Sequence, residues 1–306
     1  MIHRGPDNGG VWLSEDRNIA LAHRRLAIID LNEGSNQPFN DNTTDNKIVF
    51  NGEIYNFLEL RSELEKLGYS FETYSDTEVI LLAYDAWGLN CIDKFIGMFS
   101  FCIFDESKKE FFIARDRAGE KPLFYSLTDE TFIFSSELKS IIAFGHSELN
   151  LDSLDCYLSF GYTESDNSIL KGVRKLPPAH AMTIELSTLK QKIWPYWQLP
   201  NSNTLKNLNK EDILLDELEE LLQDAVRKQL ISDVPVGVLL SGGVDSSLIT
   251  AMAARAMKGI KTFTVSFKGF NEFDESKHAR LIADEFETDH FELVASNPEP
   301  EILISL

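Results

Sequence analysis

Cysteine is scarce in this chain and has none of the spacings that disulfide or metal sites require. Three cysteines occur in 306 residues, at positions 91, 102 and 156. Their number is odd, they lie far apart and no CxxC pair is present, which argues against a disulfide framework and a cysteine-ligated zinc site. The six histidines form no metal-spaced pair either. We therefore expect reduced thiols and a cytoplasmic location.

Long apolar runs and net positive charge are also missing. The longest apolar stretch, 97–104, is too short and too polar to span a bilayer. The N-terminus has no apolar segment of the kind found in signal peptides. With 49 acidic and 29 basic residues, the formal net charge is −20, so phosphate backbones and anionic lipids are repelled. We expect neither nucleic acid nor a membrane as a partner.

Residues 1–197 show the pattern of a layered α+β domain. Short aromatic and β-branched segments separated by polar turns predict antiparallel strands, over 21–29, 47–50, 98–104, 110–114, 122–125 and 131–134. Two amphipathic segments predict helices, one over 56–67 and one that begins at Ser75 or Asp76. Ser75 and Glu78 have the spacing of a capping box. Strands with two helices imply stacked layers.

The chain changes character after residue 197. Residues 198–210 are rich in Asn, with Pro and Ser, which is typical of a linker. The pattern then predicts helices over 212–230, 245–257 and 275–286, alternating with strands over 236–240, 262–267 and 290–294. This alternation predicts a doubly wound α/β domain with a parallel sheet over 211–306. Because such sheets have more strands than these, we expect the domain to be incomplete.

The segment Ser241-Gly242-Gly243-Val244-Asp245-Ser246-Ser247 joins a predicted strand to a predicted helix. The glycines permit close approach to a ligand, and the helix N-terminus and serine hydroxyls offer donors to an anion. Asp245 would repel phosphate unless Mg²⁺ lies between them, so it is the expected metal ligand. The segment lacks the lysine of a Walker A loop. Its structural alternative is a glycine turn with serine N-caps.

This strand, loop and helix resemble the pyrophosphate loop of the ATP-pyrophosphatase fold, specifically that of glutamine-dependent asparagine synthetases. The first part resembles the class II glutamine amidotransferase domain joined to those synthetases. Its motifs follow the family's order: Arg4-Gly5-Pro6-Asp7, Arg25-Leu26-Ala27-Ile28-Ile29-Asp30, Asn51-Gly52-Glu53-Ile54-Tyr55-Asn56, Ser75-Asp76, Arg115-Asp116-Arg117-Ala118-Gly119-Glu120-Lys121-Pro122-Leu123 and Ser136-Glu137-Leu138-Lys139. The resemblance implies a four-layer αββα sandwich of the N-terminal-nucleophile hydrolase type, followed by the incomplete parallel-sheet domain.

The resemblance also assigns roles to residues. It implies a glutamine site of Arg25, Leu26, Ala27, Ile28, Ile29, Asn51, Gly52, Glu53 and Asp76. In it, Arg25 takes the α-carboxylate and Asp76, helped by Glu53, takes the α-ammonium. The Asn51 amide and the Gly52 N–H form the oxyanion hole. It further implies an ATP and pyrophosphate site of Leu240, Ser241, Gly242, Gly243, Asp245, Ser246, Ser247 and Val265, with Leu240 and Val265 around the adenine.

Each of these roles has a structural alternative. Asp76 could be only a helix cap, and Arg25 a solvated strand residue. Asn51-Gly52 could be a type I′ turn. Leu240 and Val265 could be plain core residues. The order in which the motifs follow one another favours the functional interpretation.

The family's nucleophile is a cysteine that becomes the first residue and uses its own α-amino group as base. This sequence starts at Met1-Ile2-His3, and the Arg4-Gly5-Pro6-Asp7 motif follows directly. The nucleophilic cysteine of the family is therefore not among its first residues. Cys102 is expected to be a core thiol, and Cys91 and Cys156 lie in helical or turn segments, so none replaces that nucleophile. The family's aspartate site would lie beyond Leu306. We therefore expect the middle of a longer protein, inactive alone.

Together these features predict a glutamine-hydrolysing asparagine synthetase, a ligase of amino-acid biosynthesis. Its substrates are glutamine, aspartate and ATP with Mg²⁺. The resemblance also implies a homodimer, for which no residue argues. Two alternatives stay open: another adenylating synthetase, which forms β-lactams or modifies peptides or sugars, and a non-catalytic remnant that only binds nucleotide. The intact glutamine residues argue against the first, since lactam-forming relatives need no ammonia.

Overall fold

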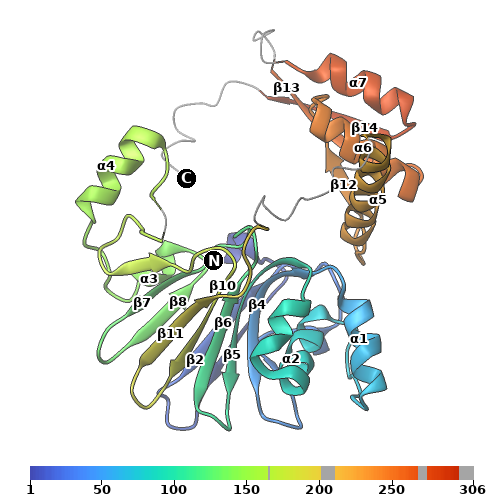
Figure 1. Ribbon diagram of the computed structural model, residues 1–306. Helices are drawn as coiled ribbons and strands as arrows, with labels where there is room; N and C mark the ends of the chain where they lie inside the picture. The colour runs from blue at the N-terminus through green and yellow to red at the C-terminus, as the bar shows by residue number, and fades with distance from the viewer. Residues whose placement is uncertain (165, 201–210, 268–273, 296–306) are drawn as a thin grey trace. The chain divides into compact units, whose positions relative to one another are not determined.

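Figure 1 shows the computed structural model, which describes residues 1–164, 166–200, 211–267 and 274–295. The chain divides into two compact units, residues 1–204 and residues 205–306. The expected linker, 198–210, contains this division, and most of it lies outside the described residues. In the part of the chain that is described, no helix is long and apolar enough to cross a membrane.

The first unit is built mainly from antiparallel strands. A six-stranded sheet has the order β11-β10-β6-β5-β4-β3, with β3 at Phe39–Asn40, β4 at Lys47–Ile54, β5 at Gly97–Asp105, β6 at Glu110–Arg115, β10 at His180–Glu185 and β11 at Lys190–Pro195. A three-stranded sheet has the order β8-β7-β9, with β7 at Phe124–Leu127, β8 at Phe132–Ser135 and β9 at Val173–Lys175. A separate hairpin pairs β1, Asn8–Leu13, with β2, Ala20–Arg25.

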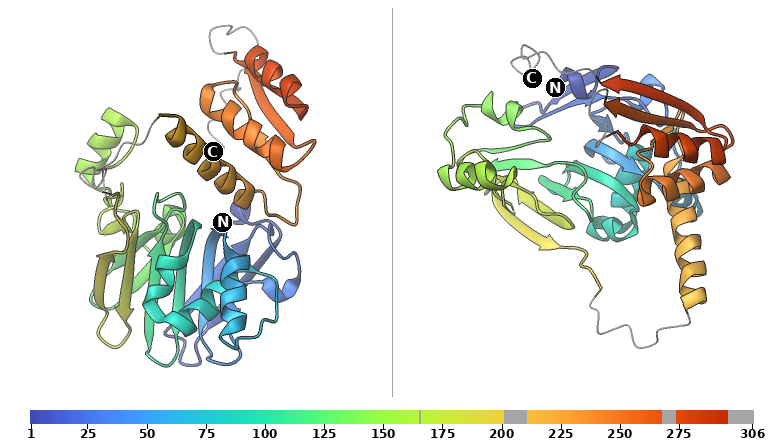
Figure 2. Two further views of the ribbon diagram at one scale, coloured as in Figure 1. Left: turned by 45° about the vertical axis from the view of Figure 1, so that its right-hand side comes forward. Right: turned by 90° about the horizontal axis from the view of Figure 1, so that it is seen from above.

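Helices cover the sheets of this unit. They are α1 at Phe57–Lys66, α2 at Asp76–Trp87, α3 at Leu138–Ile142 and α4 at Leu151–Phe160. Short 3-10 helices are η1 at Ile2–Arg4, η2 at Glu33–Ser35 and η3 at Gly88–Lys94. Figures 1 and 2 show α1 and α2 side by side against the six-stranded sheet, while α3 contacts β7 and β8.

The six-stranded sheet is apolar on both faces because it separates two cores. Neighbouring residues of a strand point to opposite faces of the sheet. The strand β6 places an apolar side chain on each face. Phe112 stacks on Tyr84 of α2, with ring centroids 5.5 Å apart. Phe111 faces the other way, into a core shared with Tyr125 of β7 and Leu21 of β2. The layers are therefore helices, sheet, sheet and helix, and the predicted four-layer αββα sandwich is confirmed.

Some boundaries differ from the sequence-based expectation. The strand expected over 21–29 ends at Arg25, because the N–H of Ala27 turns away to the carboxylate of Asp7. The strand expected over 47–50 continues to Ile54 in an unbroken ladder with β5. The sequence did not predict the strands β1, β3, β9, β10 and β11 or the helices α3 and α4. Two of these strands, β9 and β10, pair with β7 and β6, which lie far away along the chain, so local pattern does not define them.

The predicted capping box at the start of α2 is wrong. Ser75 is the N-cap, but its hydroxyl accepts from the N–H of Thr77 at 2.9 Å, not from that of Glu78. The Glu78 carboxylate instead accepts from the N–H groups of Glu72 and Thr73, at 2.8 and 2.7 Å. Glu78 therefore fixes the segment that precedes the helix and does not cap the first turn of the helix.

The second unit is a parallel α/β layer, as predicted. Its strands have the order β12-β13-β14, and both neighbouring pairs are parallel. The strands are β12 at Gly237–Leu239, β13 at Lys261–Phe267 and β14 at Asp289–Ala295, and the helices are α5 at Glu211–Gln229, α6 at Val244–Ala256 and α7 at Ser276–Glu285. Met252 and Ala253 of α6 pack with Val226 of α5, and α7 contacts β13 and β14.

Candidate functional site

The second half of β4 presents an open strand edge. Within the described residues, β3 pairs with only the first two residues of β4. Beyond them, the Phe50 N–H donates to Oε1 of Gln37 at 2.6 Å. The Ile54 N–H donates to Oδ2 of Asp76 at 3.0 Å. Because N–H groups alternate between the two edges of a strand, the Gly52 N–H points to this same edge, midway between two tethered neighbours.

Glycine is required at position 52. Its φ is +154°, and a Cβ there would lie 2.1 Å from the carbonyl oxygen of Met98 on β5. No side chain fits unless the two strands separate. Asn51 and Gly52 stand opposite Ser100 and Phe99 in the ladder. They therefore lie inside a paired strand, and the alternative of a type I′ turn is wrong.

The side-chain amide of Asn51 is held from the neighbouring sheet. Its Nδ2 donates to Oγ of Ser136 at 3.3 Å, and Ser136 follows β8. An amide nitrogen carries two N–H donors, so this bond fixes the group while one donor stays available. The Asn51 amide and the Gly52 N–H belong to consecutive residues of one strand. They are thus two neutral donors that can converge on a ligand oxygen.

Arg25 ends β2 with only 7% of its surface exposed, so the alternative of a solvated strand residue is wrong. Its guanidinium binds the loop that follows. Nη1 donates to the carbonyl of Asn32 and to Oδ1 of Asn36, both at 2.9 Å. Nη2 donates to the carbonyl of Ile29 at 3.3 Å and to that of Asp30. These contacts do not use the Nε–H.

Acidic groups surround the Arg25 guanidinium. Burial lowers the pKa of Arg25, and the charges of Asp30, Asp76 and Asp7 oppose that effect. Asp76 therefore lies within electrostatic range of Arg25, although one residue belongs to α2 and the other to β2. A cation and an anion from different elements are therefore near enough to influence one another.

Asp76 is the first residue of α2 and is 5% exposed. The N-cap is Ser75, so the alternative of Asp76 as a helix cap is wrong. The pKa of the Asp76 carboxyl group is raised to about 7, mainly by burial. The hydrogen bond from the N–H of Ile54 lowers this pKa, and the negative charge of Glu53 raises it. Burial also raises the pKa of Glu53, while Lys121 opposes it. Both carboxyl groups therefore hold their protons more tightly than in water, an effect that a cation bound beside them would reverse.

The loop after Arg25 is anchored by the Arg4-Gly5-Pro6-Asp7 motif. The carboxylate of Asp7 accepts from the N–H of Ala27 at 2.8 Å. A Cβ at Gly5 would lie 2.4 Å from the backbone of Arg24, so glycine lets the motif pass close to β2. In the predicted glutamine loop, Leu26 is exposed, and Ala27, Ile28 and Ile29 are half-buried.

None of the three cysteines lies on the open edge of β4. Cys102 stands opposite Val49 in the ladder and is fully buried in the core between the sheets, as expected. Burial raises the pKa of the Cys102 and Cys91 thiols well above the ordinary value. Cys156 lies in α4, where its thiol contacts the carbonyl of Tyr162 at 3.4 Å. These three thiols are therefore not positioned as nucleophiles for this site.

In the second unit, the predicted phosphate loop joins β12 to α6. Gly242 has a φ of +84°, and a Cβ there would lie 2.6 Å from the backbone nitrogen of Ala279 in α7. Gly243 is the N-cap of α6 and makes no side-chain cap bond, so the alternative of serine caps is wrong. The hydroxyl oxygens of Ser241 and Ser246 lie 2.9 Å apart. The loop thus presents hydroxyls and first-turn N–H groups, which α-helices leave unpaired.

The other predicted nucleotide residues differ in exposure. Asp245 is exposed, and Ser247 is half-buried. Leu240 is 1% exposed and packs on Ala279. Its carbonyl accepts from the hydroxyl of Thr264. Val265 is 47% exposed. The structure places Leu240 in the core, as its structural alternative has it, and leaves the side chain of Val265 accessible.

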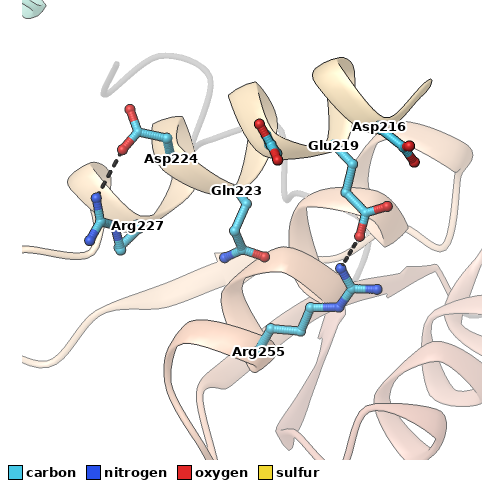
Figure 3. Close-up of a pocket in the computed structure, with 7 residues that line it drawn as sticks. Asp216, Glu219, Gln223, Asp224, Arg227 and Arg255 are labelled. Atoms are coloured by element: carbon cyan, nitrogen blue, oxygen red, sulfur yellow. Dashed lines mark hydrogen bonds and ion pairs between the residues drawn. The ribbon is translucent and has the colours of Figure 1, made fainter. Parts of the chain in front are cut away.

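Figure 3 shows a surface pocket on α5 and α6 whose lining includes no residue of the phosphate loop. Its lining residues are Asp216, Glu219, Glu220, Gln223, Asp224, Arg227 and Arg255. Arg255 pairs with Glu219, and Arg227 pairs with Asp224 at 3.0 Å. Both cations are thus already paired, and acidic groups outnumber them, which disfavours phosphate. Arg255 also lies near the C-terminal end of α6, a helix about 20 Å long whose N-terminus carries the loop.

Comparison with known protein families assigns both units. Residues 1–197 match the glutamine amidotransferase domain family. The chain belongs to the glutamine amidotransferase family. Behind this amidotransferase domain, residues 217–304 match the asparagine synthase family. The two matches follow one another in the order that the sequence motifs predicted, which confirms the predicted resemblance.

The chain is similar to several curated proteins. It is 36% identical to glutamine-hydrolyzing asparagine synthetase 3 of Bacillus subtilis, over 98% of this chain and 50% of that protein. It is 38% identical to asparagine synthetase 1 of the same organism, over 90% of this chain and 43% of that protein. An amidase of Gibberella zeae is 33% identical, over 93% and 44%. The chain thus spans about half the length of the curated relatives it matches.

Among solved structures, the chain is similar to the glutamine phosphoribosylpyrophosphate amidotransferase of B. subtilis complexed with ADP and GMP. The TM-score is 0.42 and the identity 17%, over 94% of this chain and 56% of that one. Similarity at this level is too low to support an inference.

Three residues beside the candidate glutamine site had no assigned role in the sequence. Gln37 tethers β4 through Phe50 and also donates to the hydroxyl of Thr77 at 3.2 Å. Ser136 holds the amide of Asn51, and Asp30 contacts Arg25. Asp30 and Ser136 stand within the family's motifs, and Asp30 directly follows an apolar segment, which is a signal for a buried polar role. Gln37 has no such signal.

Proposed function

We propose that the chain forms the glutamine-binding and ATP-binding parts of a glutamine-hydrolysing asparagine synthetase. Such a ligase converts aspartate into asparagine with ammonia from glutamine. The observation that carries the proposal is the open edge of β4. There the Gly52 N–H and the Asn51 amide lie on β4, the Asp76 carboxyl group binds the Ile54 N–H, and Asp76 lies within electrostatic range of Arg25. The names of relatives at 36–38% identity support the proposal.

The groups of this site match the chemistry of glutamine. Its α-carboxylate requires a cation, for which Arg25 supplies the charge. Its α-ammonium requires an anion, which Asp76 and Glu53 supply, and binding would favour the ionised form of both carboxyl groups. Attack on the side-chain amide places negative charge on its oxygen. The donors of Asn51 and Gly52 would stabilise that charge, by about 3 kcal/mol for each donor.

The second unit fits the leaving group of an adenylation reaction. The loop over 241–247 offers hydroxyls and backbone N–H groups but no lysine, so it would hold pyrophosphate without a fixed side-chain cation. In the described residues, no group of three or more His, Cys, Asp or Glu side chains could hold a metal unaided. Asp245 is exposed and offers one carboxylate. We propose that it would share Mg²⁺ with phosphate oxygens, and the ion would neutralise charge on the pyrophosphate.

Aspartate as the acceptor and a homodimer as the assembly rest on the resemblance. We propose them on that ground, together with a domain boundary in the segment 198–210. The acidic net charge of −20 supports the expectation that nucleic acid and membranes are not partners.

Calorimetric titration of the 306-residue chain with L-glutamine tests the proposal. We expect saturable binding of L-glutamine and binding of D-glutamine that is weaker by about tenfold or more, since inversion at Cα moves the ammonium away from Asp76. Arg25→Gln should weaken L-glutamine by a similar factor. Equal affinity for both enantiomers would contradict the glutamine pocket. An Arg25→Gln variant that binds L-glutamine as tightly as the wild type would also contradict it.

A pair of glycine variants tests the pyrophosphate loop. Gly242→Ala should abolish measurable binding of magnesium pyrophosphate, because the added Cβ would meet the backbone of α7 at 2.6 Å. Gly243→Ala is the matched control: its φ is −70°, and its Cβ would meet only Oγ of Ser241, at 3.6 Å. It should change the affinity by less than about threefold. Similar losses in both variants would mean that the loop tolerates no change at all and would contradict this geometry.

A further inference from the structure

Asp30 lies where the contacts from both charged ends of the proposed glutamine pocket meet. It is 4% exposed, and its φ is +53°. Its carbonyl accepts from the guanidinium of Arg25. Its carboxylate Oδ2 accepts from the N–H of Tyr74 at 2.8 Å, two residues before Asp76. One residue therefore binds the cationic end directly and the segment that carries the anionic end.

The Asp30 carboxylate also fixes its own loop. Oδ2 accepts from the hydroxyl of Ser35 at 2.6 Å. Oδ1 accepts from the N–H and from Nδ2 of Asn32, at 3.1 and 2.7 Å, and the carbonyl of Asn32 accepts from Arg25 in turn. Burial raises the pKa of Asp30, but the bonds from Ser35, Tyr74 and Asn32 outweigh it, so its pKa lies below the ordinary value. The residue acts as a charged hub at neutral pH.

The ligand imposes a strict requirement on the two ends. The α-carboxylate and α-ammonium of a free amino acid share one carbon atom, so Arg25 and Asp76 must keep a fixed separation to bind both. Arg25 ends a strand and Asp76 begins a helix, so each is placed by a different element. The φ of Asp30 lies in the left-handed region, which is uncommon for non-glycine residues but which aspartate adopts more readily than most.

We infer that Asp30 is a positioning residue that holds Arg25 and Asp76 at the separation required by a free α-amino acid. The inference rests on the proposed function, because it concerns the same pocket. The inference adds that Arg25 and Asp76 are held at a fixed separation, so the pocket recognises the α-carboxylate and the α-ammonium of the ligand together. Loss of the Asp30 carboxylate should therefore harm a ligand that needs both ends more than a ligand that needs one.

Two ligands and two variants separate positioning from general stability. L-Glutamine carries both charged groups, and its deaminated analogue glutaramate keeps the carboxylate and amide but has no ammonium. Asp30→Asn keeps the backbone carbonyl and replaces one carboxylate oxygen by a donor. Asp41→Asn is the matched control: Asp41 is 8% exposed and its carboxylate accepts from the N–H of Thr43 at 3.0 Å. It lies at the turn before β4, away from Asn51.

We expect Asp30→Asn to weaken L-glutamine about tenfold more than glutaramate, as expected for a displaced charge-assisted contact. Asp41→Asn should leave the ratio of the two affinities unchanged. Ser35→Ala removes one donor to the same carboxylate oxygen and should shift the ratio in the same direction by a smaller factor, which keeps the test available if Asp30→Asn does not fold. Equal weakening of both ligands by Asp30→Asn, or by Ser35→Ala in its place, would overturn the inference.

A second measurement decides the inference if the wild-type chain binds neither ligand, a result that would by itself refute the proposed function. The Cγ resonance of Asp76 can be titrated by NMR without any ligand. A displaced Tyr74 segment admits water to Asp76, so Asp30→Asn should lower the midpoint of that titration by about one pH unit. Asp41→Asn should not move it. An unmoved midpoint in Asp30→Asn would overturn the positioning claim.

Discussion

Replacing Asp76 with asparagine is expected to stabilise the first unit at alkaline pH. The folded state raises the pKa of this carboxyl group from 3.8 to about 7, so the native protein holds the proton more tightly than the unfolded chain. Ionisation therefore costs no stability below about pH 4, an increasing amount up to about pH 7, and the full amount above it. The asparagine side chain has no such proton to lose. The advantage of the variant should grow from near zero at about pH 4 to about 4 kcal/mol at about pH 8.

Urea unfolding at several pH values measures this effect. The four tryptophans, at positions 12, 87, 194 and 197, all lie in the first unit, so their fluorescence reports on that unit. Asp85→Asn is the matched control, since Asp85 is an exposed residue of the same helix. It should not show the gain in stability between about pH 4 and about pH 8 that Asp76→Asn shows. If the difference in free energy of unfolding between Asp76→Asn and the wild type is the same at every pH, Asp76 does not titrate as the structure indicates.

The same substitution should have the opposite effect on ligand binding. The ammonium of glutamine would lose its buried carboxylate partner, and we expect the affinity to fall by about 100-fold. A variant that is more stable yet binds more weakly identifies Asp76 as a group kept for binding at the expense of stability. Unchanged affinity in a stabilised variant would remove Asp76 from the glutamine site.

Gly52→Ala is expected to produce the largest loss of stability among single changes at the site. Its Cβ would lie 2.1 Å from the carbonyl oxygen of Met98, and its φ of +154° is unfavourable for alanine. Relief requires β4 to move away from β5, in the middle of the six-stranded sheet. Backbone strain and the broken ladder together should lower the free energy of unfolding by about 4 kcal/mol.

Gly68→Ala separates the two parts of that loss. Gly68 has a φ of +97°, and a Cβ there meets nothing within 4 Å, so only the backbone term applies, at about 1 kcal/mol. Urea unfolding followed by tryptophan fluorescence compares the variants directly. A Gly52→Ala loss no larger than that of Gly68→Ala would show that β4 and β5 are less closely packed at Met98 than the structure has them.

Local pattern predicted much of the second unit and the core strands of the first. The apolar segments around Val49, Phe101 and Phe112 are strands because each buries both faces, which periodicity and residue type reveal. The loop over 241–247 was predictable because strand, glycines, serines and helix are consecutive. The hairpin β10–β11 was not, because β10 is defined by its pairing with β6, more than 60 residues earlier in the chain.

The candidate site shows the same division. Gly52 was predicted from its motif, but the physical need for glycine depends on Met98, in the neighbouring strand. The placement of the Gly52 N–H on an open edge depends on Gln37, which no local pattern marks. The buried environment of Arg25 follows from a loop folded back on it. Sequence therefore predicts the residues that belong to motifs, and the packing of distant segments adds Gln37 and explains what each residue does.

The chemical shift of the Gly52 amide during titration with L-glutamine tests the proposed glutamine site most directly. In a ¹⁵N-labelled chain, the open edge of β4 predicts that the Gly52 N–H and the Asn51 side-chain amide shift together, saturably and with one dissociation constant. L-Glutamate, which lacks the amide, should shift Asp76 but leave the Gly52 resonance nearly unmoved. A titration in which L-glutamine shifts neither group of β4, or shifts only residues of the second unit, would contradict the proposed site.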